Sequence, residues 1–307
     1  AGRRVEQVRS GTLAAPRSFE VVGAADLDPT SARVLVVVHP GALAMLRNEL
    51  ATAGGRGGVA GAAYALKLGA QGGKLLTDLG LDVTEDGPAG PARAAGEGLR
   101  ALALRAGQQA IRHSRNPDIS TAILLAGPAL QDSRNAAVHR LGERLRQQLV
   151  DGQRPDGAWA VSVGPRSIQQ ELVTTAAATR ALADIAALPC EDVALAARRK
   201  REAALARVRA SGVFERHAAA VTDAYTAASL LVSGAVEGEE AAALRTKVLD
   251  ALTSRPDGSM VLTVAPDVRR FDGGTPSAAE ATALAAQALS TAGPAEVVAD
   301  LGAGLLG

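Results

Sequence analysis

One six-residue segment occurs twice in the chain, and this repeat constrains the fold more than any other feature of the sequence. Arg154-Pro155-Asp156-Gly157-Ala158-Trp159 returns as Arg255-Pro256-Asp257-Gly258-Ser259-Met260. Pro-Asp-Gly is turn chemistry, because proline fixes φ, aspartate caps the turn and glycine accepts a positive φ. Each copy follows a helical segment and leads, after a loop, into an Ala- and Thr-rich helical segment near Glu171 or Glu280. The repeat unit is therefore helix, turn, loop and helix.

The chain from residue 41 onward has the apolar spacing of helices, and Gly- and Pro-containing breaks separate the segments. Ser167, Ser277 and Asp118 are expected N-caps. The pattern predicts helices over 42–52, 58–70, 92–113, 118–130, 135–150, 167–187, 191–210, 215–234, 238–253, 277–291 and 294–306, with a weaker one over 72–80. We therefore expect a mainly α fold of about twelve helices, or about six hairpins.

Residues 1–40 differ from the rest. They contain β-branched runs, the clearest being Val34-Leu35-Val36-Val37-Val38, which His39-Pro40 ends. Such runs predict short strands. We expect residues 1–40 to belong to, or to border, a flanking β-module, and residues 41–307 to form the helical domain.

The core of the helical domain should consist mainly of Ala and Leu. Hydrophobic residues make up 47% of the chain but aromatic residues only 2%. Alanine is the best helix former and lets helix axes approach closely, which suits layered hairpins. An aromatic-lined cavity, as a cyclase would need to hold carbocations, is not expected from so few aromatic residues.

The charge balance excludes some partners. The formal net charge is +1, from 33 basic and 32 acidic residues, so there is no basic field of the kind that attracts nucleic acid. Arg198-Arg199-Lys200-Arg201 is interpreted as a solvated helix face. No apolar run reaches the roughly 18 residues that a membrane span needs. The single cysteine, Cys190, excludes an internal disulfide and a thiolate metal cluster, and its role stays open.

No catalytic, metal or cofactor site is recognised. The glycine cluster over 54–61 follows a helical segment, whereas a dinucleotide fingerprint follows a strand. The four histidines are scattered, without the spacing of metal ligands. Asp156, Asp257, Glu171 and Glu280 could act as paired carboxylates on a sugar, but turn and capping roles already account for them. Trp159 either anchors a ligand or partner, or fixes its turn onto the adjacent helices.

An Asp-Gly turn with an aromatic residue, followed by a helix with Glu, Thr and small residues, resembles the α/α-toroid superfamily. Within it the chain is most similar to the thioester-containing domain of bacterial α2-macroglobulins. The stretches that carry this resemblance are Arg33–Pro40 with Leu43–Leu46, Asp156–Trp159 with Glu171–Leu182, and Ser277–Leu284. The resemblance implies an α/α toroid across the chain, a location in the periplasm or outside the cell, proteases or other proteins as partners, and flanking β-domains. We therefore expect the chain to be a piece of a larger protein.

The chain departs from this family at its reactive centre. Active members carry Cys-x-Glu-Gln at the start of the second helix, where the Cys and Gln side chains close a thioester. The corresponding residues here are Gly57, Gly58, Val59 and Ala60, so the resemblance implies a domain that has lost covalent capture. Two alternatives stay open: an α/α-toroid enzyme with an atypical site, either terpene cyclase-like or carbohydrate-active, and a freestanding helical-repeat scaffold.

Overall fold

The computed structural model describes Glu49 and residues 52–53, 58–78, 91–113, 117–131, 135–161, 167–256 and 258–306. Within these residues the chain forms α-helices, one 3₁₀ turn and one small sheet, which confirms the mainly α prediction. The elements are α2 (Gly58–Asp78), α3 (Pro91–His113), α4 (Ile119–Gln131), α5 (Ala136–Asp151), α6 (Ile168–Ala186), α7 (Val193–His217), η1 (Ala218–Ala220), α8 (Ala224–Val232), α9 (Gly238–Asp250), β1 (Leu252–Ser254), β2 (Met260–Leu262), α10 (Ala278–Leu289) and α11 (Ala295–Leu306). The predicted β segment 1–40 and most of the predicted helix 42–52 lie outside the described residues.

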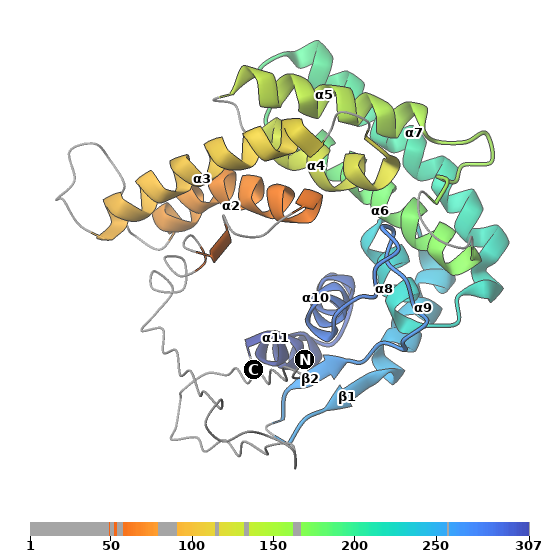
Figure 1. The fold of residues 1–307 in the computed structure, drawn as a ribbon. Coiled ribbons are helices and arrows are strands. Elements are labelled where there is room, and N and C mark those ends of the chain that lie inside the picture. Colours follow the sequence, from red (N-terminus) through yellow and green to blue (C-terminus); the bar gives the residue numbers. More distant parts are fainter. Residues whose placement is uncertain are drawn as a thin grey trace, which may run out of the picture.

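The helices pair in chain order. The hairpins are α2 with α3, α4 with α5, α6 with α7, α8 with α9, and α10 with α11. The first helices of these pairs also pack on one another in sequence, so α2, α4, α6, α8 and α10 form one continuous row. In Figure 1 this row follows an arc, and α3, α5, α7 and α9 cover its outer side. Closure of the arc into a toroid stays a prediction.

The row of first helices packs through alanine, as the composition predicts. Buried alanines occur on each of these helices, for example Ala62 on α2, Ala126 on α4, Ala178 on α6, Ala228 on α8 and Ala285 on α10. Since an alanine side chain is a single methyl group, neighbouring helix axes can lie close together. The buried side chains form two clusters: one spans α2 to α5, the other spans α8 to α11, and both include residues of α6 and α7.

Helix starts follow the predicted cap chemistry. The side chains of Ser167 and Ser277 accept hydrogen bonds from the backbone N–H groups of Gln170 and Glu280, and Asp118 accepts one from Thr121 at 2.7 Å. Each cap satisfies one of the four backbone donors that a helix leaves without a partner at its start. These polar residues therefore fix where α6, α10 and α4 begin.

Two predicted helix breaks were wrong. The segments 58–70 and 72–80 are one helix, α2, which continues through Gly72. The break predicted between 210 and 215 is also absent, because α7 continues to His217. There Ala210, Val213 and Phe214 are buried on one face. Their spacing extends the apolar stripe past Gly212, so packing outweighs the cost of that glycine.

A β-hairpin was missed. The predicted helix 238–253 ends at Asp250, and β1 pairs antiparallel with β2 directly afterwards. Each strand has only three residues, too few for the alternating pattern that reveals a strand. The second Pro-Asp-Gly repeat joins them.

Candidate functional site

The first repeat loop is a tight turn fixed by its own backbone. Arg154 donates its N–H to Ala158 O at 2.9 Å, and Gly157 donates to Arg154 O at 2.9 Å. The Asp156 carboxylate accepts the Ala158 N–H at 3.0 Å, and this hydrogen bond is the main reason why the pKa of Asp156 lies below its ordinary value. Gly157 has φ +95°, and a side chain there would collide with the backbone of Arg209 on α7. Asp156 and Gly157 therefore have turn roles.

Trp159 lies at the base of this loop and is fully buried. Its indole Nε1–H donates to Leu149 O at 2.8 Å, and its backbone N–H donates to Thr175 Oγ1 at 3.2 Å. Leu149 is in the last turn of α5, where carbonyl groups have no helical partner. Trp159 thus joins the end of α5 to the middle of α6, and it presents no surface to a ligand.

The loop is also tied to α7 by a residue that the sequence analysis did not single out. The Gln153 side-chain amide donates to Gly157 O at 2.9 Å and to Ala206 O at 3.0 Å. A glutamine just before an Arg-Pro-Asp-Gly turn was visible in the sequence, but its target on α7 was not. Gln153 and Trp159 together hold the turn among three helices.

The predicted residue Glu171 is engaged by the same loop. Arg154 Nη2 lies 2.9 Å from Glu171 Oε1 and 2.9 Å from Asp156 Oδ2. Glu171 is in the first turn of α6, where a negative charge is favoured by the helix dipole. The arginine therefore connects the turn to the start of the following helix.

The second repeat has the same turn geometry. Arg255 donates its N–H to Ser259 O at 2.7 Å, and Gly258 donates to Arg255 O at 3.0 Å with φ +84°. Asp257, which the sequence analysis also singled out, lies outside the described residues. This turn joins β1 to β2, so the repeated sequence forms a repeated structure.

A third copy of the turn was missed in the sequence. Arg270 donates its N–H to Gly274 O at 2.8 Å, Gly273 donates to Arg270 O at 3.0 Å, and Asp272 Oδ1 accepts the Gly274 N–H at 3.1 Å. Gly273 has φ +82°. The spacing Arg-x-Asp-Gly, without the proline, would have found this copy.

The third turn uses its arginine as the first one does. Arg270 Nη2 lies 2.6 Å from Asp272 Oδ2, and Nη1 lies 2.9 Å from Glu280 Oε2 in the first turn of α10. Burial alone would lower the pKa of Arg270, but the hydrogen bond that Arg270 donates to Asp272 and the negative charge of Glu280 outweigh burial, so the pKa is raised. Arg154 with Glu171 and Arg270 with Glu280 are therefore equivalent pairs.

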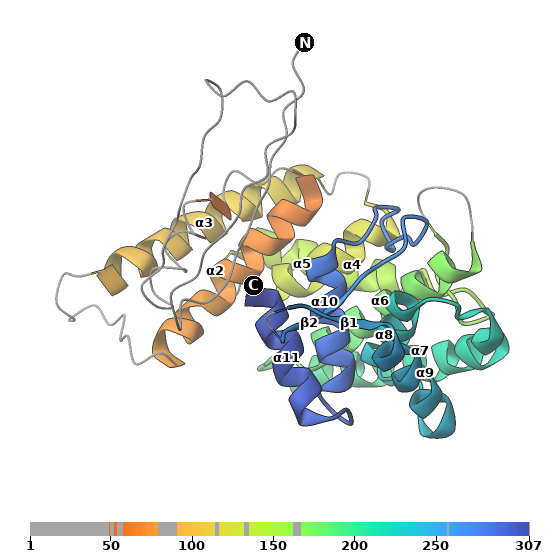
Figure 2. The ribbon, with the colours of Figure 1, turned by 90° about the horizontal axis from the view of Figure 1, so that it is seen from below.

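The Arg270 turn connects the starts of several inner-row helices. Its backbone carbonyls accept hydrogen bonds from Ser120 of α4 at 3.1 Å, through Phe271 O, and from Gln170 of α6 at 3.4 Å, through Arg270 O. Tyr225 of α8 donates its hydroxyl to Glu280 Oε1 at 3.1 Å. Burial, reinforced by the Glu280 charge, raises the pKa of Tyr225 and keeps it protonated as a donor. In Figure 2 the loop from β2 to α10 extends toward α4 and α6.

We call Ser120, Gln170, Tyr225, Arg270, Asp272 and Glu280 the helix-start cluster. It joins side chains of α4, α6, α8 and α10 to the Arg270 turn, and the sequence analysis found only Glu280 of it. Both carboxylate oxygens of Glu280 have a partner, one in Tyr225 and one in Arg270. The cluster stabilises the row of helix starts.

A second ionic cluster lies between α5 and α7. Arg146 and Arg199 are only 2% and 5% exposed. Arg146 forms ion pairs with Glu143 and Glu202, and Arg199 forms one with Glu143. The interpretation of Arg198–Arg201 as wholly solvated was thus wrong at Arg199, which faces α5 because it falls on the buried side of α7. A buried guanidinium needs such partners.

The described residues in the thioester position have no reactive side chain. Gly58, Val59 and Ala60 form the first turn of α2, and Gly57 lies outside the described residues. The half-buried Cys190 lies between α6 and α7, where its thiol contacts Asp192 O at 3.4 Å. Gly58 to Ala60 supply neither the thiol nor the amide of a thioester.

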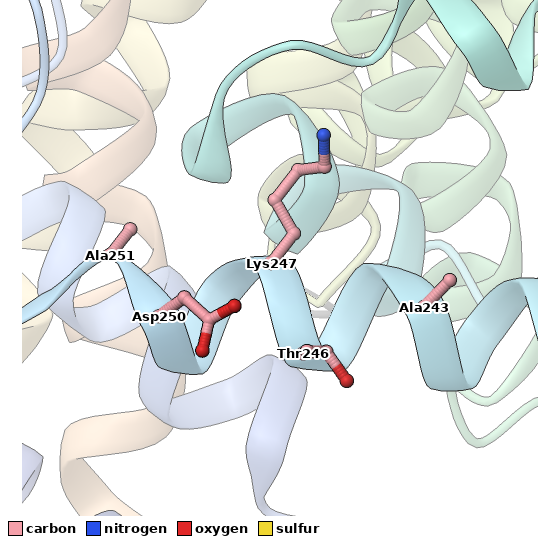
Figure 3. A pocket seen from close by; sticks show the side chains of 5 residues that line it. All are labelled: Ala243, Thr246, Lys247, Asp250 and Ala251. Carbon is pink, nitrogen blue, oxygen red and sulfur yellow. The ribbon is translucent and has the colours of Figure 1, made fainter.

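A pocket lies along α9 and the residue that follows it. Figure 3 shows its lining, which consists of Ala243, Thr246, Lys247, Asp250 and Ala251. The Lys247 ammonium group donates to Val221 O at 2.7 Å, so it holds the segment before α8. None of the residues singled out in the sequence lines this pocket.

Within the described ranges, no three His, Cys, Asp or Glu side chains are grouped as metal ligands. None of the helices that the structure describes is both long enough and apolar enough to cross a membrane.

No protein-family model matches the chain, and no curated protein is significantly similar to it.

Proposed function

We propose that the chain is a non-catalytic α/α-hairpin domain of the thioester-domain type that has lost the thioester and acts through contacts with other proteins. In this proposal it belongs to a larger bacterial α2-macroglobulin-like protein, which traps proteases or binds at a surface. The resemblance of the Asp-Gly loops and of the following helices supports this origin, and so does the ordered row of first helices.

The observation that carries the non-catalytic part is the engagement of the candidate carboxylates. Acid–base catalysis needs a carboxyl group that can exchange a proton with a substrate. Glu280 accepts hydrogen bonds from Tyr225 and Arg270, and Glu171 pairs with Arg154. Both carboxylates already serve to fix loops onto helices.

The loss of the thioester is tested by methylamine, which opens such a bond and leaves a covalent adduct on the protein. The full chain is incubated with methylamine and its intact mass is measured. We expect an unchanged mass, because the first turn of α2 offers only Gly58, Val59 and Ala60.

The matched control is Cys190→Ser, since Cys190 is the single cysteine. We expect the same unchanged mass for this variant. A stoichiometric adduct on the natural chain that Cys190→Ser abolishes would show that a thioester forms and would overturn the proposal.

A further inference from the structure

The exposed side of α7 carries a stripe with the spacing of a helix-pairing surface. Ala194, Ala197, Arg201, Ala204 and Val208 are all exposed. They alternate three and four residues apart, which is the spacing that keeps one seam of a helix facing a partner helix. We call these residues the α7 stripe.

Large apolar side chains on and beside the α7 stripe are exposed to solvent. Val208 is 69% exposed, Leu205 is 52% exposed and Val193, at the start of α7, is 80% exposed. Single exposed apolar side chains are ordinary on a protein surface, but here three lie along one face of one helix. The opposite face of α7 is already occupied, because Ala203, Ala206, Ala210, Val213 and Phe214 are buried.

Basic side chains border the stripe on both edges. Lys200 and Arg207 follow one edge, and Arg198 and Arg209 follow the other. Arg207 pairs with Glu237 at 2.7 Å and Arg198 lies 3.8 Å from Glu202. No residue that the structure describes forms an ion pair with Lys200, Arg201 or Arg209. The face therefore combines Ala and Val side chains with positive charge, from Arg201 within the stripe and from Lys200 and Arg209 at its edges, that no described acidic residue neutralises.

The combination of small apolar side chains and positive charge on α7 favours one class of partner. The alanines of the α7 stripe allow the backbone of a second helix to approach closely. The basic side chains at both edges of the stripe favour acidic residues at the matching positions of that helix. A second copy of this chain would bring cations against cations. A lipid surface fits less well, because the α7 face offers Val193, Leu205 and Val208 but none of the aromatic side chains that anchor proteins at membrane interfaces.

We propose that the exposed face of α7 docks an acidic amphipathic helix of another protein. The inference rests on the proposed interaction function and names the class of its partner. α7 lies on the outer side of the arc in Figure 1, so this face is open to a partner without any rearrangement of the inner row.

A synthetic peptide serves as the probe. It has about four heptads, close to the length of α7, with Leu and Ala at the seam positions and Glu at both edges. A control peptide carries Lys in place of each Glu. Binding of the labelled peptides to the full chain is followed by fluorescence anisotropy at low and high salt. We expect the acidic peptide to bind, the basic peptide not to bind, and high salt to weaken binding.

Two charge-reversal variants localise the binding. Lys200→Glu with Arg201→Glu reverses charge on the α7 face, and we expect it to weaken acidic-peptide binding at least about tenfold, since it places like charges against the peptide. Lys67→Glu with Arg105→Glu makes the same change in net charge at exposed positions of α2 and α3. We expect this control to bind within about twofold of the natural chain, and far-UV circular dichroism verifies that both variants are folded.

Three outcomes would overturn the proposal: no binding of the acidic peptide, equal loss in both double variants, or binding to vesicles of anionic phospholipid without binding to the peptide. The last result would identify the α7 face as a membrane surface. These outcomes leave the methylamine result unchanged, so failure of the docking proposal and failure of the thioester-loss proposal can be told apart.

Discussion

The role of Trp159 as a structural anchor leads to a quantitative prediction. Trp159→Phe keeps an aromatic ring in the site but removes the indole N–H that donates to Leu149 O at 2.8 Å. A buried carbonyl left without a donor costs about 1–3 kcal/mol. The smaller ring leaves a void in a site without solvent exposure, which adds about 1 kcal/mol. We therefore expect the free energy of unfolding to fall by about 2–4 kcal/mol.

Urea unfolding followed by far-UV circular dichroism measures this loss, since the variant lacks the tryptophan signal. The control is Phe271→Leu in the Arg270 turn, where the ring is only half-buried and the cost should stay below about 1 kcal/mol. A loss below about 0.5 kcal/mol for Trp159→Phe would refute the assignment of Trp159 as the anchor between α5 and α6.

Three further predictions concern buried polar groups. Burial alone would raise the pKa of Glu143, but its hydrogen bonds and ion pairs with Arg146 and Arg199 outweigh burial and lower the pKa. The Glu143 carboxylate therefore stabilises the folded state at neutral pH, and this contribution is lost as the pH falls through the folded-state pKa. Glu143→Gln should thus cost about 2–4 kcal/mol at pH 7 and progressively less as the pH falls below the ordinary carboxyl pKa of 4.5, as measured by urea unfolding; a cost that does not change with pH would contradict this. Burial and the nearby Glu215 raise the pKa of Glu240, so the charged carboxylate is disfavoured in the folded state. Glu240→Gln should raise the Tm at pH 7, with a gain that narrows as the pH falls and Glu240 takes up a proton; a lowered Tm would exclude this. Thr282 Oγ1 accepts the Leu262 N–H of β2 at 3.0 Å, so Thr282→Val should cost about 1–3 kcal/mol, whereas the exposed Thr246→Val should stay within about 0.5 kcal/mol; equal effects in thermal unfolding would refute this role.

The features that the sequence predicted well are those set by neighbouring residues. Ser167 and Ser277 cap α6 and α10 by accepting hydrogen bonds from residues three positions later. The Arg-Pro-Asp-Gly turn is likewise closed by its own backbone, so its two sequence copies predicted two structural copies. Such interactions span only a few residues and can therefore be read from the sequence directly.

The features that were missed depend on residues far apart in the chain. Arg199 is buried because Glu143, 56 positions away, lies opposite it. The helix-start cluster unites Glu280 with Tyr225, 55 positions away, and its turn with Ser120, 151 positions from Phe271. α7 continues past Gly212 because Val213 and Phe214 pack into the buried cluster that spans α8 to α11. None of these partners can be identified from local spacing alone.

The order of helix contacts also has a consequence for how the domain loses its structure. Each described hairpin packs mainly on the hairpins next to it in sequence, so its stability is set by its nearest neighbours, as in repeat proteins. The pair α6 and α7 contributes to both buried clusters, and it is therefore supported from two sides. We expect its backbone amides to exchange with solvent most slowly, and opening to spread inward from hairpins with a single neighbour. A destabilising substitution in α6 would then divide the domain from one cooperative unfolding unit into two units of lower stability.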